Sequence, residues 1–142
     1  MIRFASLAAP AALVAALLAA PLAHAELMAE GNIGKFKVFY VLDGKMALAS
    51  QDGRTLYTFD KDTAGKSTCN DECAKNWPPM LAVAADAPFE SFSILTRDDG
   101  TRQWAYEGKP LYRSAKDTAP EQANGQGAND AWHIIEIVAH DM

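Results

Sequence analysis

The sequence predicts an all-β protein, an antiparallel sandwich or a partly closed barrel built from two pseudo-repeats, with one short helix. Three observations lead to this fold class. Short β-type runs recur between turn signals, one nine-residue stretch returns at an offset of 55 residues, and a single stretch carries helical signals. The mature chain is long enough for one domain with its own core.

The chain begins with a segment, residues 1–25, that is typical of a cleavable secretory signal peptide. Arg3 precedes an apolar run from Phe4 to Leu22, and the run ends in Ala23-His24-Ala25, a small-x-small cleavage pattern. Two prolines in the run and this cleavage pattern argue against a membrane anchor. We therefore expect a mature protein, residues 26–142, that is periplasmic or secreted and does not span a membrane.

The charge and the motif inventory exclude several classes of function. The expected signal peptide holds one of the 13 basic residues and none of the 18 acidic ones, which leaves a mature net charge of −6. An acidic domain repels phosphate backbones, so no nucleic-acid partner is expected. The sequence contains no Gly-x-Ser-x-Gly, no His-Glu-x-x-His, no phosphate loop and no dinucleotide fingerprint. We expect neither an enzyme nor a bound cofactor or metal.

An internal repeat organises the mature chain. The stretch Leu56–Ala64 matches Leu111–Ala119 at six of nine positions. The same offset aligns two further pairs: Gly53 with Gly108, and Trp77 with Trp132. Repeat 1 spans about 36–80 and repeat 2 about 91–138. Each copy is too small for a stable core, so we expect the two to pack together as one domain.

The first repeat opens with a predicted hairpin. The runs Phe36–Leu42 and Lys45–Gln51 flank Asp43-Gly44, a strong signal for a two-residue turn. A further strand is expected over Thr55–Asp60.

The second repeat follows the same plan. Its runs Phe92–Arg97 and Gln103–Tyr106 flank the turn Asp98-Asp99-Gly100. Strands are then expected over Pro110–Ser114 and Trp132–Ala139, which gives the regular strand spacing of an antiparallel meander.

One helix is expected between Cys69 and Trp77. Thr68-x-x-Asp71 resembles a capping signal, and Pro78-Pro79 would end the helix.

Cys69 and Cys73 are the only cysteines, and three roles fit them. In an oxidising compartment an even pair forms a disulfide, which here requires Cys69 to lie in the turn before the helix. A redox-active dithiol is a second role, although its usual motif has two intervening residues. A metal site is the third, with further ligands from His133 or His140.

Several motifs together resemble a known family: Leu56-Tyr57-x-Phe59-x-x-Asp62, Cys69-x-x-x-Cys73, Trp77-Pro78-Pro79 and Lys109-Pro110-Leu111-Tyr112. The chain is similar, over roughly Gly44 to Val138, to the bacterial predicted lipoproteins with a Tyr-x-aromatic-x-x-Asp motif, also described as a secreted repeat of unknown function. Two features depart from the family pattern. The cleavage site lacks a lipidation cysteine, and the second copy has Ser114 in place of the aromatic. The resemblance implies fold and export and brings no established activity.

The motif residues are the candidate ligand site. Tyr57, Phe59 and Asp62 of the first copy correspond to Tyr112 and Asp117 in the second. In one interpretation the aromatic rings fill the core and each Asp accepts backbone N–H bonds in a turn. In the other, Tyr hydroxyls and Asp carboxylates converge on a paired ligand site between the repeats.

Trp77 and Trp132 occupy equivalent positions in the two repeats. They are interpreted as structural core anchors, with a stacking platform for sugars or aromatic ligands as the alternative.

These expectations define a non-catalytic periplasmic or secreted module with a binding or structural role in the cell envelope. Its partner would be an unknown envelope component or a small molecule. The alternative is a periplasmic redox or metal-handling protein that uses Cys69 and Cys73.

Overall fold

The computed structural model describes residues 31–41 and 44–138. The expected signal peptide, Asp43 of the first turn and His140 lie outside these residues. Within the described residues, no helix is both long enough and apolar enough to cross a membrane.

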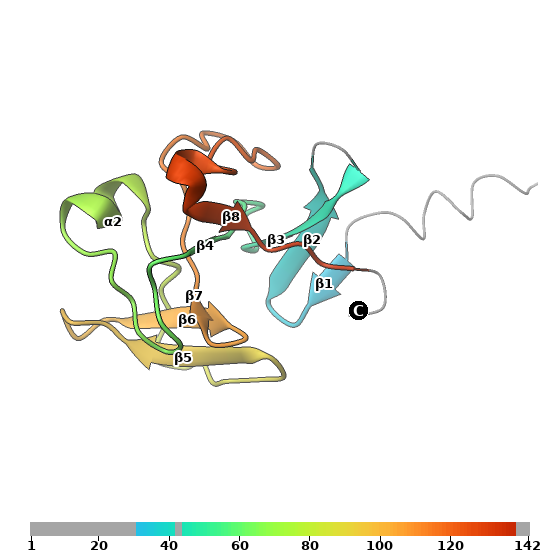
Figure 1. Cartoon of the computed structure of the whole chain (residues 1–142). Coiled ribbons are helices and arrows are strands. Elements are labelled where there is room, and N and C mark those ends of the chain that lie inside the picture. The colour runs from blue at the N-terminus through green and yellow to red at the C-terminus, as the bar shows by residue number, and fades with distance from the viewer. Residues whose placement is uncertain (1–30, 42–43, 139–142) are drawn as a thin grey trace, which may run out of the picture.

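The described strands form three small antiparallel sheets (Figure 1). The first sheet holds β1 (Gly31–Ile33), β2 (Phe36–Tyr40) and β3 (Met46–Ala49). The second holds β5 (Phe92–Thr96), β6 (Arg102–Tyr106) and β7 (Lys109–Pro110). The third pairs β4 (Tyr57–Phe59) with β8 (Trp132–Ile134). The predicted all-β antiparallel fold is confirmed, and the described strands do not close into a barrel.

Both predicted hairpins are present. In the second, the Arg97 N–H donates to the Thr101 carbonyl at 2.8 Å, so Asp98-Asp99-Gly100 forms the turn as expected. In the first, the Val41 N–H donates to the Lys45 carbonyl at 2.8 Å, and the predicted turn between them includes Asp43, which lies outside the described residues. The β1 strand extends the first hairpin and was not predicted.

The two repeats exchange their last segments. Strand β3 of repeat 1 forms backbone hydrogen bonds with the last segment of repeat 2. Strand β6 of repeat 2 forms them with the segment that follows Pro79 at the end of repeat 1. Four backbone N–H to carbonyl bonds carry this exchange: Leu48 to Ile135 (3.1 Å), Ile137 to Met46 (2.9 Å), Trp104 to Met80 (2.9 Å) and Ala82 to Arg102 (2.9 Å). The third sheet is itself such an exchange, because β4 and β8 come from different repeats.

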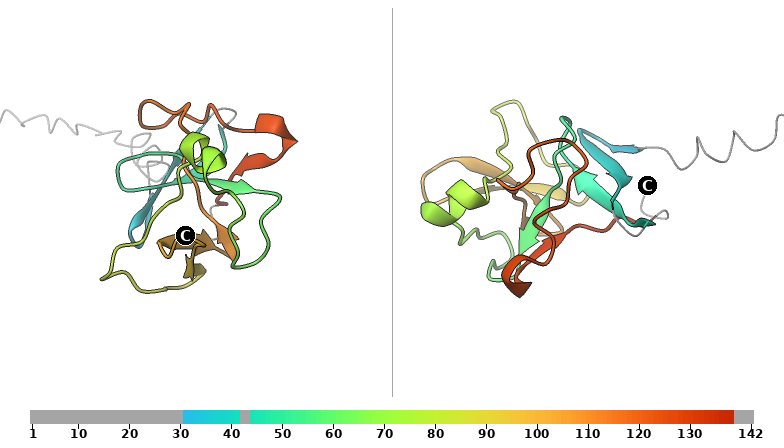
Figure 2. Two further views of the ribbon diagram at one scale, coloured as in Figure 1. Left: turned by 90° about the vertical axis from the view of Figure 1, so that its left-hand side faces the viewer. Right: turned by 90° about the horizontal axis from the view of Figure 1, so that it is seen from above.

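Equivalent residues of the two repeats meet at the centre of the molecule. The Tyr57 N–H donates to the Tyr112 carbonyl at 2.8 Å, and the Tyr112 N–H donates to the Tyr57 carbonyl at 2.9 Å. Position 57 is therefore paired with its own repeat counterpart, as at a two-fold axis. Figure 2 shows β4 and β8 lying between the two hairpin sheets.

Two hydrophobic clusters fill the interior. The larger lies between the hairpins, where the rings of Phe36 and Phe92 stack with centroids 4.3 Å apart and Trp104 packs edge-on to Phe36. Aromatic pairs of this geometry contribute about 0.5–1.5 kcal/mol beyond their area burial. The smaller cluster contains Tyr57, Tyr112 and the disulfide residue Cys69.

The predicted helix is α2 (Glu72–Asn76), and a 3₁₀ turn, η2 (Ala128–Asp130), lies in the second repeat. The capping signal was wrong. Asp71 precedes α2 with φ of 52° and makes no side-chain cap, while the Thr68 hydroxyl donates instead to Asp62 Oδ1 at 2.8 Å. Thr68 lies too far from the helix start because the chain first turns through the disulfide.

Candidate functional site

The motif tyrosines and aspartates form two crossed pairs. The Tyr57 hydroxyl donates to Asp117 Oδ2 at 2.6 Å, and the Tyr112 hydroxyl donates to Asp62 Oδ2 at 2.7 Å. Each tyrosine thus binds the aspartate of the other repeat. Both tyrosine side chains are fully buried. The crossed pairs therefore fasten the two repeats to each other.

Each aspartate also closes the loop that follows it. Asp62 Oδ1 accepts the Thr68 N–H at 2.8 Å, and Asp117 Oδ1 accepts the Asn124 N–H at 2.8 Å. Carboxylates that accept backbone N–H bonds in this way hold a turn in place.

The tyrosine hydroxyls stay protonated over the ordinary pH range. Burial and the hydrogen bond to Asp117 raise the pKa of Tyr57 far above its usual value of 10.0. Burial, with the bond to Asp62, raises the pKa of Tyr112 to about 12 even though the contact with Ser67 acts in the opposite direction. A protonated hydroxyl is what each carboxylate needs as a donor, so the pKa shifts and the crossed pairs agree.

A buried arginine extends one of these pairs. Arg97, only 6% exposed, donates from Nη1 to Ser67 Oγ at 2.8 Å, and Ser67 Oγ lies 2.6 Å from the Tyr112 hydroxyl. Because Tyr112 donates to Asp62, the Ser67 hydroxyl donates to Tyr112. Two hydroxyls thus connect a buried guanidinium to a carboxylate, which reduces the penalty of burying its charge.

The Cys69–Cys73 disulfide is confirmed, and Cys69 lies before α2 as its geometry requires. Arg97 Nη2 donates to the Cys69 carbonyl at 2.8 Å and to Asn70 Oδ1 at 3.0 Å, so one guanidinium holds the disulfide loop. In the described part of the chain, no group of three or more His, Cys, Asp or Glu side chains is placed to hold a metal ion.

Trp77 and Trp132 stack on each other. Their ring centroids are 3.9 Å apart with an interplanar angle of 3°, and Phe59 stacks on Trp132 at 4.2 Å. Exposures of 8% and 3% leave neither indole with an open face for a sugar ring. This geometry favours the core interpretation.

The departure at Ser114 has a structural reason. Ser114 is the repeat counterpart of Phe59, and the place of a second stacked ring is taken by the backbone of Gly125 against Trp77. A Cβ atom at Gly125 would lie 2.6 Å from the Trp77 ring and 3.1 Å from Ser114 Cβ. The small residues therefore let this loop reach the core, where the Gly125 N–H donates to the Tyr57 hydroxyl at 3.2 Å.

The five candidate ligand-binding residues are thus brought together as the two crossed pairs and the Phe59 stack. Their hydroxyl and carboxylate groups bind one another and the adjoining loops. A ligand-binding role for them stays a prediction.

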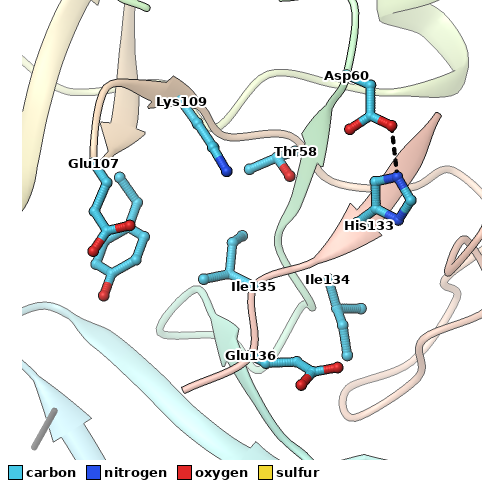
Figure 3. Close-up of a pocket in the computed structure, with 9 residues that line it drawn as sticks. Thr58, Asp60, Glu107, Lys109, His133, Ile134, Ile135 and Glu136 are labelled. Atoms are coloured by element: carbon cyan, nitrogen blue, oxygen red, sulfur yellow. Dashed lines mark hydrogen bonds and ion pairs between the residues drawn. The ribbon is translucent and has the colours of Figure 1, made fainter. Parts of the chain in front are cut away.

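A polar groove of about 380 Å³ lies beside β4 and β8, and none of the five candidate ligand-binding residues lines it (Figure 3). Thr58, Glu107 and Lys109 line it, together with His133, whose Nε2 is hydrogen-bonded to Asp60 Oδ2 at 2.8 Å. Thr58 lies directly opposite His133 in the β4–β8 register.

Sequence reasoning missed this groove because it examined positions at which the repeats agree. Asp60 corresponds to Ala115, and His133 corresponds to Pro78. Polar residues that appear in one copy only were the signal that could have found the groove.

Comparison with known protein families identifies the family of this chain. A family described as a secreted repeat of unknown function matches residues 41–80 and 93–136, more than half of the chain. The two matched segments are the two repeats that the sequence predicts. The chain belongs to this family of secreted repeat proteins. No curated protein and no solved structure matches it.

Proposed function

We propose that the protein is a non-catalytic binding module of the cell envelope, exported to the periplasm or the cell exterior after cleavage behind Ala25. One observation carries this proposal: a groove with unpaired polar side chains lies beside a core in which the motif tyrosines and aspartates are already paired with each other. A pre-formed site of this kind binds without large rearrangement.

The surroundings of His133 support a binding role over a catalytic one. His133 is the only histidine among the described residues, and its ring nitrogen is bonded to Asp60. Within that part of the chain, the ring has no hydrogen bond to a hydroxyl that it could activate as a nucleophile.

The experiment that tests the proposal is a nuclear magnetic resonance titration of the mature protein. The low-molecular-mass fraction of the envelope is added, and backbone shifts are followed at Thr58, Lys109 and His133. We expect reversible shifts confined to the groove, with the added compounds recovered unchanged. Consumption of an added compound by the wild type, lost in Asp60→Asn with the fold intact, would contradict a non-catalytic role.

A further inference from the structure

The groove has an internal counterpart in the other repeat. The offset of 55 aligns Thr58 with Arg113 and Glu107 with Asp52. In the counterpart, Arg113 Nη1 lies 3.3 Å from Asp52 Oδ2, and Arg113 Nη2 lies 3.7 Å from the Sδ atom of Met80. Asp52, the residue equivalent to Glu107, is therefore already paired with a guanidinium of the chain itself.

The basic residue of the counterpart also has a hydrogen-bond partner. Lys109 aligns with Arg54, whose Nη1 donates to the Asp117 carbonyl at 2.8 Å. In the counterpart, the acidic residue Asp52 therefore binds a cation, and the basic residue Arg54 binds a carbonyl oxygen.

In the groove, the equivalent residues Glu107 and Lys109 have no such partners among the described residues. Thr58 is too short to reach Glu107 as Arg113 reaches Asp52. Among the described residues, neither Glu107 nor Lys109 has a hydrogen bond or an ion pair through its side chain. Figure 3 shows the Lys109 side chain ending beside Thr58, and Glu107 on the opposite side of the drawn residues from Asp60 and His133.

We propose that this groove binds an organic cation that also carries a carbonyl or carboxylate oxygen, the chemistry of a basic amino acid or a basic peptide residue. The inference rests on the proposed binding function. The ligand's cation takes the place that Arg113 has in the counterpart and pairs with Glu107. Its oxygen accepts a hydrogen bond from Lys109.

Charge and size agree with such a ligand. Of the three lining carboxylates, Asp60 is bonded to His133 and Glu136 is paired with Lys45, which leaves Glu107 to receive the ligand's cation. Ile135, the counterpart of Met80, offers an apolar surface for the ligand's aliphatic stem. An adjoining hollow of about 260 Å³ shares four of the lining residues, so an extended ligand has room.

The first arm of the test varies the ligand. N-acetyl-arginine amide is titrated into the mature protein by calorimetry and by backbone resonance shifts. The citrulline analogue removes the cation, and n-butylguanidine keeps the cation but removes the carbonyl oxygens without adding a charge. We expect each to bind about tenfold more weakly, since each loses a hydrogen bond to a charged group.

The second arm varies the chain. Thr58→Arg introduces a guanidinium that can pair with Glu107 as Arg113 pairs with Asp52, and it should abolish binding. Thr96→Arg adds the same charge at an exposed site on β5 and should leave binding unchanged. Arg113→Thr frees Asp52 but leaves Arg54 bonded to the Asp117 carbonyl, so it should add a second site about tenfold weaker than the first. Unchanged dispersion of the resonance spectrum verifies the fold of each variant.

The outcomes separate the two proposals. Equal binding of the citrulline analogue, or unchanged binding by Thr58→Arg, overturns the cation assignment. If a neutral disaccharide shifts the groove resonances and the arginine compounds do not, the ligand class is wrong and the binding function stands. If neither these compounds nor the envelope fraction shifts those resonances, both proposals fail.

Discussion

Tyr57 and Tyr112 each occupy a motif whose aspartate they do not bind. Each hydroxyl donates to the aspartate of the other copy, at 2.6 and 2.7 Å. The motif therefore acts between repeats. A single copy would leave a buried hydroxyl and a loop carboxylate without their partners, which is unfavourable for both groups.

The raised tyrosine pKa values predict a loss of stability at alkaline pH. The folded state holds the Tyr112 proton up to a pKa of about 12, while the unfolded chain releases it near 10.0. The corresponding stability is fully present below pH 10 and falls as the pH rises toward 12. Ultraviolet absorbance of phenolate should increase together with loss of circular dichroism. Ionisation of all four tyrosines near pH 10 in a folded protein would contradict this.

Removing one hydroxyl should destabilise the two crossed pairs unequally. Asp117 is 8% exposed, whereas Asp62 is partly open to water, which can replace a lost donor. We expect Tyr57→Phe to lower the free energy of unfolding by about 2 kcal/mol and Tyr112→Phe by about 1 kcal/mol. Urea denaturation of both variants measures the difference. The reverse order would mean that the contact with Ser67 dominates.

At the scale of the element, two devices hold the loop before α2, and they should differ in strength. The disulfide closes a short loop, so the Cys69→Ala/Cys73→Ala variant should lose about 2 kcal/mol. Arg97→Met leaves several buried acceptors without a donor and should lose about 3 kcal/mol or more. Chemical denaturation without reductant compares them. A larger loss in the cysteine variant would assign the loop's order to the covalent link.

Local signals predicted most elements of this fold. Asp98-Asp99-Gly100 has the residues that its turn requires, and the apolar run before it forms β5, in which Phe92 and Leu95 are buried. The capping prediction at Thr68 failed because a tertiary partner, Asp62, takes its hydroxyl. Sequence spacing cannot report such competition. It also cannot show that Glu107 lacks a partner, since that depends on what lies across the groove.

The whole molecule depends on an exchange that the repeat offset alone does not reveal. An offset of 55 states which residues are equivalent, and leaves open whether each hairpin pairs with its own last segment or with the other's. The structure has the second arrangement, with β3 bonded to the chain around Ile135 and β6 to the chain around Met80. Sequentially distant pairing of this kind arises only when both copies are present.

This exchange predicts that neither repeat folds alone and that the two complement each other. A fragment of residues 26–90 has β3 and β4 but lacks β8 and the segment that covers β3. A fragment of residues 91–142 has β6 but lacks the Met80 segment, so each exposes unpaired strand edges and half of the aromatic core. Each should give the circular dichroism of an unfolded chain, and an equimolar mixture should regain β signal and the near-ultraviolet signal of the stacked Trp77 and Trp132. Tyr57→Phe in the first fragment should weaken the association. A cooperative thermal transition in either fragment alone would show instead that a repeat can pair its own last segment with its own hairpin.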